Sequence, residues 1–275
     1  MIITIDGIKC ECERGEYLLQ IAKRNKIFIP TLCNHEGLGS LGACRLCIVE
    51  VASGGRSQVV ASCVYPVERE MEVFTNSEKI KEERGVILAL LAHLAPNAKV
   101  IRQMAAFAGV ELPRLANKED GDTCVLCGRC TTACELVGSG AIAKINRGAT
   151  KAIGTPYDQS SPECIGCASC AHVCPTESIP FSETDTTVTI WGRTFDLQRC
   201  ACCGRPISTD EMIANAKLKN AKLAPNADGA ENAKSAESAT VDAATAESSL
   251  ADALMLCAAC RKQAVAEKIR ASFKI

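Results

Sequence analysis

Cysteine is the residue type whose number and spacing in this chain could support chemistry. There are 19 cysteines among 275 residues, and sixteen of them form four groups of four with short, regular gaps. Thiolates spaced in this way bind metal ions or metal clusters. The other use of many cysteines, a disulfide framework, belongs to exported proteins. Residues 1–10 lack the layout of a signal peptide, so we expect metal centres in a cytoplasmic protein.

The two central groups form an internal repeat of the run C-x2-C-x2-C-x3-C, displaced by 40 residues. This is the spacing of two-cluster bacterial ferredoxins, in which the fourth cysteine of each run serves the other cluster. A pair of zinc knuckles is the weaker interpretation, because zinc sites usually use paired C-x2-C units. Gly128 and Gly166 are expected where the backbone approaches cluster sulfide. We predict two [4Fe–4S] clusters, the first on Cys124, Cys127, Cys130 and Cys174 and the second on Cys134, Cys164, Cys167 and Cys170.

The first group has the longer spacing C-x10-C-x2-C-x15-C and comprises Cys33, Cys44, Cys47 and Cys63. Strand patterns at residues 2–8, 45–52 and 59–63 surround it, and residues 18–25 form an amphipathic helical pattern. Strands and one helix around four cysteines predict a β-grasp domain that holds a [2Fe–2S] cluster. Plant-type ferredoxins have four residues between the first two cluster cysteines, whereas this chain has ten.

Glycines 37, 39 and 42 match the G-x-G-x-x-G fingerprint of dinucleotide sites. That fingerprint has meaning only between a strand and a helix, and no helix pattern follows here. We therefore expect these glycines to let backbone amides approach the cluster. Without another nucleotide motif, the chain is expected to carry electrons without binding NAD(P)(H) itself.

The fourth group consists of two C-x2-C pairs near the carboxyl end: Cys200, Cys203, Cys257 and Cys260. A β-hairpin pattern at residues 186–197, turning at Trp191 and Gly192, precedes the first pair. Such pairs bind Zn²⁺ or a further [4Fe–4S] cluster. Gly204 after the first pair favours a zinc-ribbon-like site. Cys202 could replace Cys203 as a ligand, but the C-x2-C spacing of Cys200 and Cys203 is better suited to two thiolates on one metal.

Two features outside these groups are expected to have no chemical role. Residues 224–249 are rich in Ala, Glu, Asp and Ser and predict a flexible insertion or a weak, exposed helix. Cys10 and Cys12 fit small buried residues on one face of a strand. No arrangement typical of an acid, base or nucleophile is present, so we predict no catalytic residue.

The elements required to position the cysteines predict an α+β chain of four parts. The capping-box pattern Thr75-x-x-Glu78 marks the start of a helix with apolar residues at helical spacing. The predicted parts are a [2Fe–2S] β-grasp domain at 1–76, a helical connector at 77–120, a two-[4Fe–4S] domain at 121–182 and a zinc-ribbon-like module at 183–275.

The segments IPTLC at 29–33 and GACRLCIVEV at 42–51 resemble a known family. They are similar to the [2Fe–2S] domain at the start of the large iron–sulfur subunit of respiratory complex I. The small diaphorase subunit of NAD-reducing hydrogenases and the iron–sulfur subunits of electron-bifurcating hydrogenases and formate dehydrogenases share this domain. The resemblance extends over residues 1 to about 180 and implies an electron-transfer subunit between a flavin/NAD(P)(H) module and a hydrogenase-type or formate dehydrogenase-type catalytic subunit.

The same resemblance implies a hetero-oligomer. Its partners would be a flavin-bearing NAD(H)-binding subunit with its small [2Fe–2S] companion, and a catalytic oxidoreductase subunit. Two alternatives are a self-standing polyferredoxin carrier and a zinc-stabilised adaptor without redox function. Members of the family often have a His-x3-Cys-x2-Cys-x5-Cys site after the first domain. Here His93 is followed by no cysteine before Cys124, so we expect that cluster to be missing and His93 to lie at a helix end.

Charge and hydropathy exclude two classes of partner. The 31 basic and 32 acidic residues give a net charge of −1, whereas a general nucleic-acid binder needs a basic surplus. A membrane span needs about 20 consecutive apolar residues, and the longest apolar run is far shorter. We therefore expect neither nucleic acid nor direct membrane insertion.

Overall fold

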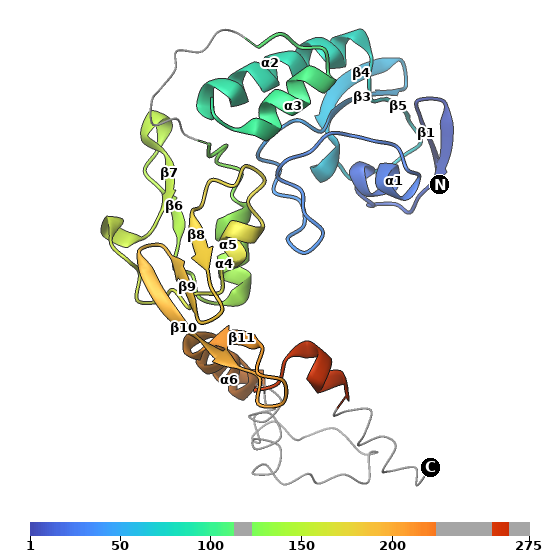
Figure 1. Cartoon of the computed structure of the whole chain (residues 1–275). Helices are drawn as coiled ribbons and strands as arrows, with labels where there is room; N and C mark the ends of the chain where they lie inside the picture. The colour runs from blue at the N-terminus through green and yellow to red at the C-terminus, as the bar shows by residue number, and fades with distance from the viewer. Residues whose placement is uncertain (113–122, 224–254, 264–275) are drawn as a thin grey trace, which may run out of the picture. The chain divides into compact units, whose positions relative to one another are not determined.

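The chain packs into two units in a computed structural model that describes residues 1–112, 123–223 and 255–263 (Figure 1). The first unit contains Met1–Leu136, Ile142–Gly154 and Ser169–Ile179. The second contains Val137–Ala141, Thr155–Ala168 and the described residues from Pro180 onward. Both units combine helices and strands, which confirms the predicted α+β class.

The first unit is built on a five-stranded mixed sheet and one short helix. Its strands, in the order β2-β1-β5-β3-β4, are β1 (Ile2–Ile5), β2 (Ile8–Glu11), β3 (Ile48–Ser53), β4 (Arg56–Ala61) and β5 (Glu72–Phe74). β1 and β5 run parallel, and the other neighbours in this sheet run antiparallel. With α1 (Leu18–Arg24) against the sheet, this is the predicted β-grasp arrangement.

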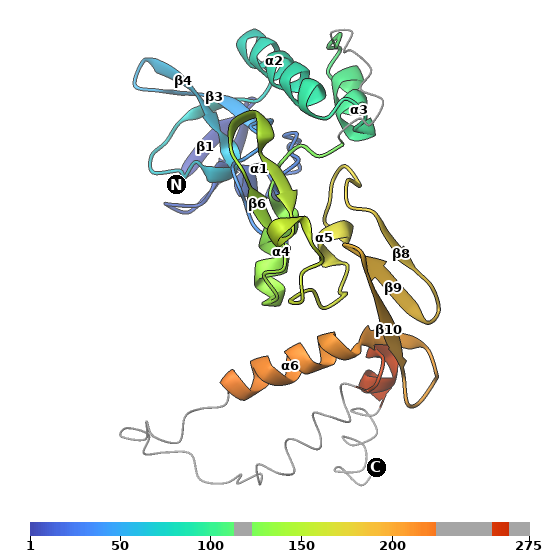
Figure 2. The same cartoon turned by 90° about the vertical axis from the view of Figure 1, so that its left-hand side faces the viewer.

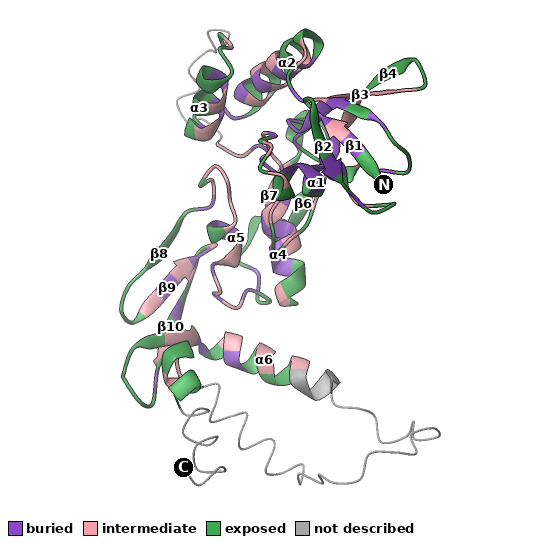
Figure 3. Cartoon of the chain, turned by 90° about the vertical axis from the view of Figure 1, so that its right-hand side faces the viewer, coloured by how far each residue is buried: buried purple, intermediate pink, exposed green. Residues whose placement is uncertain are grey.

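Alternating apolar residues explain how the sheet and α1 pack. Ile3 and Ile5 point to the same side of β1 because successive strand residues face opposite ways, and Leu18 and Ile21 of α1 meet them in one core. Each such aliphatic side chain contributes about 1.5–3 kcal/mol when fully buried. The leftover thiols Cys10 and Cys12 belong to this core, where they occupy the space of small apolar residues. Figure 3 shows buried residues concentrated in β1 and α1.

The cysteine loop shortens the strands on either side of it. The strand predicted at 45–52 begins only at Ile48, and the one predicted at 59–63 ends at Ala61. Cys63 lies in a 3₁₀ turn, η1 (Ser62–Val64). The backbone N–H and hydroxyl of Ser62 both donate to the carbonyl of Cys47, at 3.0 and 2.8 Å. These bonds hold the turn against the ligand loop instead of continuing the strand ladder.

Two helices follow the sheet, α2 (Glu78–Leu94) and α3 (Lys99–Phe107). The predicted capping role of Thr75 is wrong: Ser77 caps α2 by accepting a hydrogen bond from the backbone N–H of Ile80. Thr75 is unavailable because its hydroxyl and N–H both donate to the carboxylate of Asp6. His93 lies exposed in the last turn of α2, as expected.

The repeat region contributes short elements to the first unit. They are α4 (Arg129–Val137, whose last residue is assigned to the second unit), β6 (Ala143–Ile145), η2 (Gly148–Thr150), β7 (Ala152–Gly154) and α5 (Ser169–His172). Gly128 has φ +82°, and a Cβ there would meet the side chain of Lys144 at 2.7 Å. The positive φ therefore favours glycine before α4, whereas the flexible end of the lysine side chain could move aside.

The second unit carries a four-stranded antiparallel sheet. In addition to η3 (Pro156–Asp158), its elements are β8 (Phe181–Glu183), β9 (Thr187–Ile190), β10 (Arg193–Arg199), β11 (Pro206–Thr209) and α6 (Asp210–Leu223). The strand order is β11-β10-β9-β8. Trp191 and Gly192 both have positive φ, 51° and 73°, between paired Ile190 and Arg193. This is the two-residue turn that matches strand twist, so the predicted hairpin is confirmed.

Residues 258–263 form a short helix that returns to the sheet. The N–H of Ala201 donates to the carbonyl of Met255 at 3.0 Å, and Figure 2 shows the short helix (red) and α6 beside β10. The predicted insertion at 224–249 lies outside the described residues. Among the helices that are described, none has the length and apolarity needed to cross a membrane.

Candidate metal centres

The first group of cysteines converges in the first unit. Cys33, Cys44, Cys47 and Cys63 are each at most 4% exposed. The thiol of Cys33 lies within hydrogen-bonding reach of Cys44 and Cys63, and Cys63 lies within reach of Cys47. The backbone N–H of Leu32 donates to Cys44 Sγ at 3.4 Å, and that of Cys44 to Cys33 Sγ at 3.5 Å. Buried thiols that accept backbone donors fit the thiolate ligands of a [2Fe–2S] cluster.

Contacts among these four thiols lower the pKa values of two of them and raise those of the other two. Hydrogen bonds from Cys44 and Cys63 hold the pKa of Cys33 far below its usual value, and a bond from Cys63 lowers the pKa of Cys47 to about 6. The pKa of Cys44 is raised by its contact with Cys33 and by burial. That of Cys63 is raised by its contacts with Cys33 and Cys47. Because metal ligands are thiolates, the four thiols would lose their protons when a cluster binds.

A second convergence in the first unit involves the repeat. Burial raises the pKa of Cys127, and the charges of Cys174 and Cys124 raise it further. Burial, followed by the charge of Cys127, raises the pKa of Cys130 to about 12. These interactions place Cys174, which belongs to the later run, within electrostatic reach of Cys127 in the earlier run. Backbone donors reach Cys124 Sγ from Leu126 at 3.4 Å and Cys174 Sγ from Ser178 at 3.2 Å.

Arg129 supplies an independent test of whether this second set fits a cluster. Its Nε is buried and has no hydrogen-bond partner in the described part of the chain. An unpaired buried donor costs about 1–3 kcal/mol. The positive charge of Arg129 acts on the thiol of Cys127, whose pKa it lowers against the larger effect of burial. The sulfur atoms of a [4Fe–4S] cluster are acceptors that the polypeptide lacks at this point, so the donor set fits the cluster.

The two sites in the first unit share one apolar core. Cys33, Cys44 and Cys127 belong to a single buried cluster of residues, together with Leu32, Leu46, Leu88, Ala92, Ala95, Ala98, Ile101, Ala105 and Val125. The Nη1 of Arg129 also donates to the carbonyl of Leu32 at 3.2 Å. The [2Fe–2S] loop and the first [4Fe–4S] loop are therefore held together by packing and by a hydrogen bond.

The other predicted set draws residues from both units and stays a prediction: Cys134 and Cys170 lie in the first, Cys164 and Cys167 in the second. Within the second unit, β10 and β11 hold the loop between Cys164 and Cys167. Nη1 of Arg193 donates to the carbonyl of Cys164 at 2.8 Å, and Oγ1 of Thr209 donates to that of Ile165 at 2.6 Å.

Glycine 166 lies in this loop under the ring of Phe195 of β10. A Cβ at Gly166 would meet the ring at 2.6 Å, and its φ is +68°. The guanidinium of Arg193 stacks on the same Phe195 ring, with its Cζ 4.5 Å from the ring centre. The carboxyl-terminal sheet thus shapes a loop that carries two predicted ligands.

The fourth group of cysteines is brought together in the second unit. The Sγ atoms of Cys200, Cys203, Cys257 and Cys260 all lie within 4.8 Å of one another, and Cys203 and Cys257 are 3.6 Å apart. Backbone N–H groups of Cys257 and Cys203 lower the pKa of Cys200 to about 6. A thiol with such a pKa is largely a thiolate at neutral pH, which is the form that binds metal.

The fifth cysteine of this region, Cys202, is exposed. Its thiol contacts that of Cys260 and, as the first of several neighbours, raises the pKa of Cys260. Cys202 is not a member of the four-cysteine cluster. This grouping of the thiols agrees with the expected preference for Cys203 over Cys202.

Three arginines near these sites were not singled out from the sequence: Arg84, Arg129 and Arg193. Arg84 is 7% exposed and occupies a position on the apolar stripe of α2 that includes Ile80 and Leu88. A charged residue on a buried stripe was the available signal. For Arg193 the sequence contained no such signal, because the partners of this side chain depend on how the hairpin packs on the Cys164 loop.

Two comparisons with known families define the class of protein. Residues 1–78 match a 2Fe-2S iron-sulfur cluster binding domain, and residues 118–181 match a 4Fe-4S dicluster domain. The chain is thus an iron–sulfur protein with a [2Fe–2S] domain followed by a dicluster [4Fe–4S] domain and a carboxyl-terminal cysteine cluster. The predicted order of these parts is confirmed.

The relatives include subunits of NADH- and NADPH-linked oxidoreductases. The NADP-reducing hydrogenase subunit HndD of Solidesulfovibrio fructosivorans is 32% identical over 212 residues, which cover 65% of this chain and 36% of that protein. The mitochondrial NADH-ubiquinone oxidoreductase 78 kDa subunit of Candida albicans is 32% identical over 62% of this chain and 21% of that protein. The NADPH-Fe(3+) oxidoreductase subunit alpha of Geobacter sulfurreducens is 29% identical over 64% and 24%, respectively.

This chain spans 36% or less of the length of these three relatives. Among solved structures, an NAD+-reducing [NiFe]-hydrogenase in the H2-reduced state matches with a TM-score of 0.55 and 24% identity. The match covers 64% of this chain and 85% of the other, and it supports the fold. A putative formate dehydrogenase of Staphylococcus haemolyticus is 27% identical over 64% of this chain and 20% of that protein. Together these relatives confirm the sequence-based resemblance to complex I, hydrogenase and formate dehydrogenase subunits.

Proposed function

We propose that this chain relays single electrons between a flavin-bearing NAD(P)(H) module and a catalytic subunit of the hydrogenase or formate dehydrogenase type. The observation that carries the proposal is the shared core that contains Cys33, Cys44 and Cys127. Ligands of two predicted centres pack in one apolar layer, which supports transfer between them inside the protein. When bound, each cluster would accept and release one electron at a time.

The cofactors proposed are one [2Fe–2S] cluster, two [4Fe–4S] clusters and one Zn²⁺. The [2Fe–2S] ligands would be Cys33, Cys44, Cys47 and Cys63. The crossed sets given above would hold the [4Fe–4S] clusters. The neighbourhood of Cys127 and Cys174 supports the crossing for the first set.

Zinc, instead of a further [4Fe–4S] cluster, is proposed for the carboxyl-terminal site. Four thiolates on one zinc ion, each about 2.3 Å from it, lie at tetrahedral edges of about 3.8 Å. A [4Fe–4S] cluster needs more room, because each thiolate binds a different iron at a different corner. Separations within 4.8 Å for all four Sγ atoms support a single ion. Its role would be structural, since four protein ligands leave no open position.

The proposed partners are a flavin-bearing NAD(H)-binding subunit with its small [2Fe–2S] companion, and a catalytic oxidoreductase subunit, in a hetero-oligomer located in the cytoplasm. The subunit nature of the relatives supports this assembly. The second candidate is a self-standing polyferredoxin. Co-purification of the chain with a flavoprotein from its source would favour the first.

The test is anaerobic reconstitution of the full chain, followed by NAD(P)H and a flavin-bearing NAD(P)H-oxidising subunit. We expect cluster reduction only when the flavoprotein is present. Cys47→Ser should remove the [2Fe–2S] signal and stop reduction from NAD(P)H, while dithionite still reduces the [4Fe–4S] clusters. Reduction of the variant by NAD(P)H at the normal rate would contradict the relay. The matched control is Cys10→Ser, because Cys10 is equally buried but belongs to the sheet core.

A further inference from the structure

Arg84 of α2 is buried against the backbone of the [2Fe–2S] ligand loop. Its Nε donates to the carbonyl of Leu46 at 3.2 Å, and its Nη2 donates to the carbonyl of Ile48 at 2.9 Å. These carbonyls flank Cys47 on both sides. The same Nη2 also donates to the carbonyl of Thr75 at 3.0 Å, at the end of β5. One side chain therefore joins α2, the strand that follows the ligand loop and the neighbouring strand.

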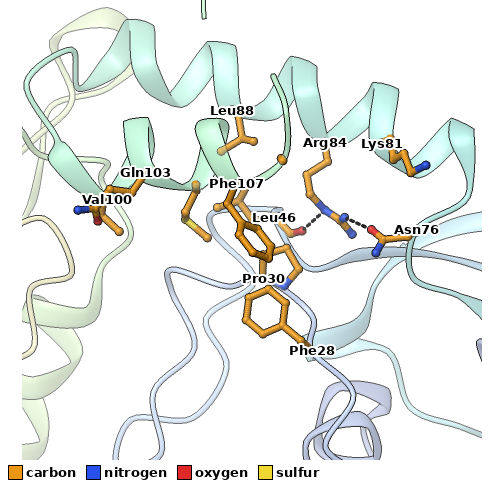
Figure 4. A pocket seen from close by; sticks show the side chains of 12 residues that line it. Phe28, Pro30, Leu46, Asn76, Lys81, Arg84, Leu88, Val100, Gln103 and Phe107 are labelled. Atoms are coloured by element: carbon orange, nitrogen blue, oxygen red, sulfur yellow. Dashed lines mark hydrogen bonds between the residues drawn. The ribbon is translucent and has the colours of Figure 1, made fainter. Parts of the chain in front are cut away.

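The fourth bond of Arg84 goes to a neutral side chain. Nη1 donates to Oδ1 of Asn76 at 3.1 Å, as Figure 4 shows. Arg84 stands at the polar end of a mostly apolar pocket of about 540 Å³ that includes Leu88, Met104 and Phe107. The guanidinium is thus fixed by four acceptors, none of which is charged.

No carboxylate pairs with Arg84 within the ranges that the structure describes. Burial lowers the pKa of its guanidinium, and the charge of Cys47 raises it. A guanidinium nevertheless stays protonated in proteins. A buried charge without an opposite charge is strongly unfavourable, so a counter-charge is required nearby.

A [2Fe–2S] cluster held by the four thiolates would provide that counter-charge. When bound, it would carry a net negative charge, which one-electron reduction makes more negative. A fixed positive charge in surroundings of low dielectric favours the more negative, reduced form. Solvent does not screen this interaction, since only 7% of Arg84 is exposed.

We infer that Arg84 is a positioning residue that fixes the backbone around Cys47 and raises the reduction potential of the [2Fe–2S] centre through its buried positive charge. This inference rests on the proposed cluster at Cys33, Cys44, Cys47 and Cys63. It assigns to α2 a task beyond connecting two domains: the helix carries the charge that makes this centre a better electron acceptor.

The experiment is an EPR-monitored redox titration of the [2Fe–2S] signal in the reconstituted full chain, with dithionite as reductant. Arg84→Gln removes the charge and keeps a hydrogen-bonding side chain. We expect the equilibrium between oxidised and reduced cluster to shift about tenfold toward the oxidised form, a midpoint about 59 mV more negative for one electron. Arg84→Lys retains the charge and should keep the midpoint much nearer to that of the parent chain.

The matched control is Lys81→Gln, which removes the same charge from the same helix. Lys81 is 56% exposed and paired with Glu78, so solvent and its partner screen it, and the midpoint should not move. If Arg84→Gln does not assemble, Asn76→Asp places a carboxylate against the intact guanidinium and should lower the midpoint.

An unchanged midpoint in Arg84→Gln or, where that variant fails, in Asn76→Asp would overturn the inference. Equal shifts in Arg84→Lys and Arg84→Gln, or in Lys81→Gln and Arg84→Gln, would also overturn it. If the parent chain showed no [2Fe–2S] signal at all, the proposed function would fail instead. The two failures are therefore distinguishable.

Discussion

The guanidinium of Arg129 donates from Nη1 to the carbonyl oxygen of Leu32 at 3.2 Å. Leu32 directly precedes Cys33, and Arg129 lies between Cys127 and Cys130. The bond therefore joins a side chain of one ligand loop to the backbone of the other, between residues 97 positions apart in the sequence. The contribution of Arg129 to stability depends also on its buried Nε, which would have no acceptor if the cluster were missing.

Replacement of Arg129 by Met should destabilise the cluster-loaded chain by about 1–3 kcal/mol, since charge-assisted bonds at the loop and the cluster are lost together. Chemical denaturation followed by loss of the [4Fe–4S] absorbance measures this. Arg102→Met is the control, because Arg102 also donates to a carbonyl, that of Pro96, but at the surface. Equal stability of the two variants would show that Arg129 does not link the loops energetically.

Metal analysis of the anaerobically prepared chain should give about ten iron atoms and one zinc per chain, from one [2Fe–2S] cluster, two [4Fe–4S] clusters and the carboxyl-terminal site. About fourteen iron atoms without zinc would place a further [4Fe–4S] cluster on Cys200, Cys203, Cys257 and Cys260. About two iron atoms would contradict the assignment of the repeat to [4Fe–4S] clusters.

The crossed assignment of the repeat predicts which cluster each fourth cysteine serves. Cys174→Ala should damage the cluster held by Cys124, Cys127 and Cys130, because Cys174 lies beside Cys127. Cys134→Ala should damage the other cluster. Mössbauer or EPR spectra of the two variants, each combined with a ligand substitution in one run, identify the affected cluster. Loss of the cluster of the same run in each variant would refute the crossing.

The carboxyl-terminal cysteines predict a contrast between neighbours. Cys203→Ser should release the zinc, whereas Cys202→Ser should retain it, because only Cys203 belongs to the four-thiol cluster. Elemental analysis after dialysis against a mild chelator distinguishes them. Zinc loss should also loosen the loop of Cys164 and Cys167, which β10 and β11 hold, and so reduce iron content. Zinc retention in Cys203→Ser together with zinc loss in Cys202→Ser would show that Cys202, and not Cys203, is the fourth ligand.

Local spacing determined the parts of this protein that depend on near neighbours in the chain. The runs of cysteines at fixed intervals, the period-two pattern of the first strands and the Trp191-Gly192 turn each involve residues within a few positions of one another. Their geometry is set by near neighbours, so the individual strands, the repeat and the hairpin could be predicted. The parallel pairing of β1 with β5, by contrast, joins segments far apart in the chain.

Tertiary structure decided the contacts that join distant segments. Thr75 could not cap α2 because Asp6, 69 positions away, accepts both of its donors. Arg84 reaches the Cys47 loop across 38 positions and Arg129 reaches Leu32 across 97. The spacing of the two carboxyl-terminal C-x2-C pairs suits zinc or a cluster, and beyond the hint from Gly204 it is the separation of the four folded thiols that favours a single ion. A motif specifies ligand types, but the charges and donors around those ligands are set by which elements pack against them.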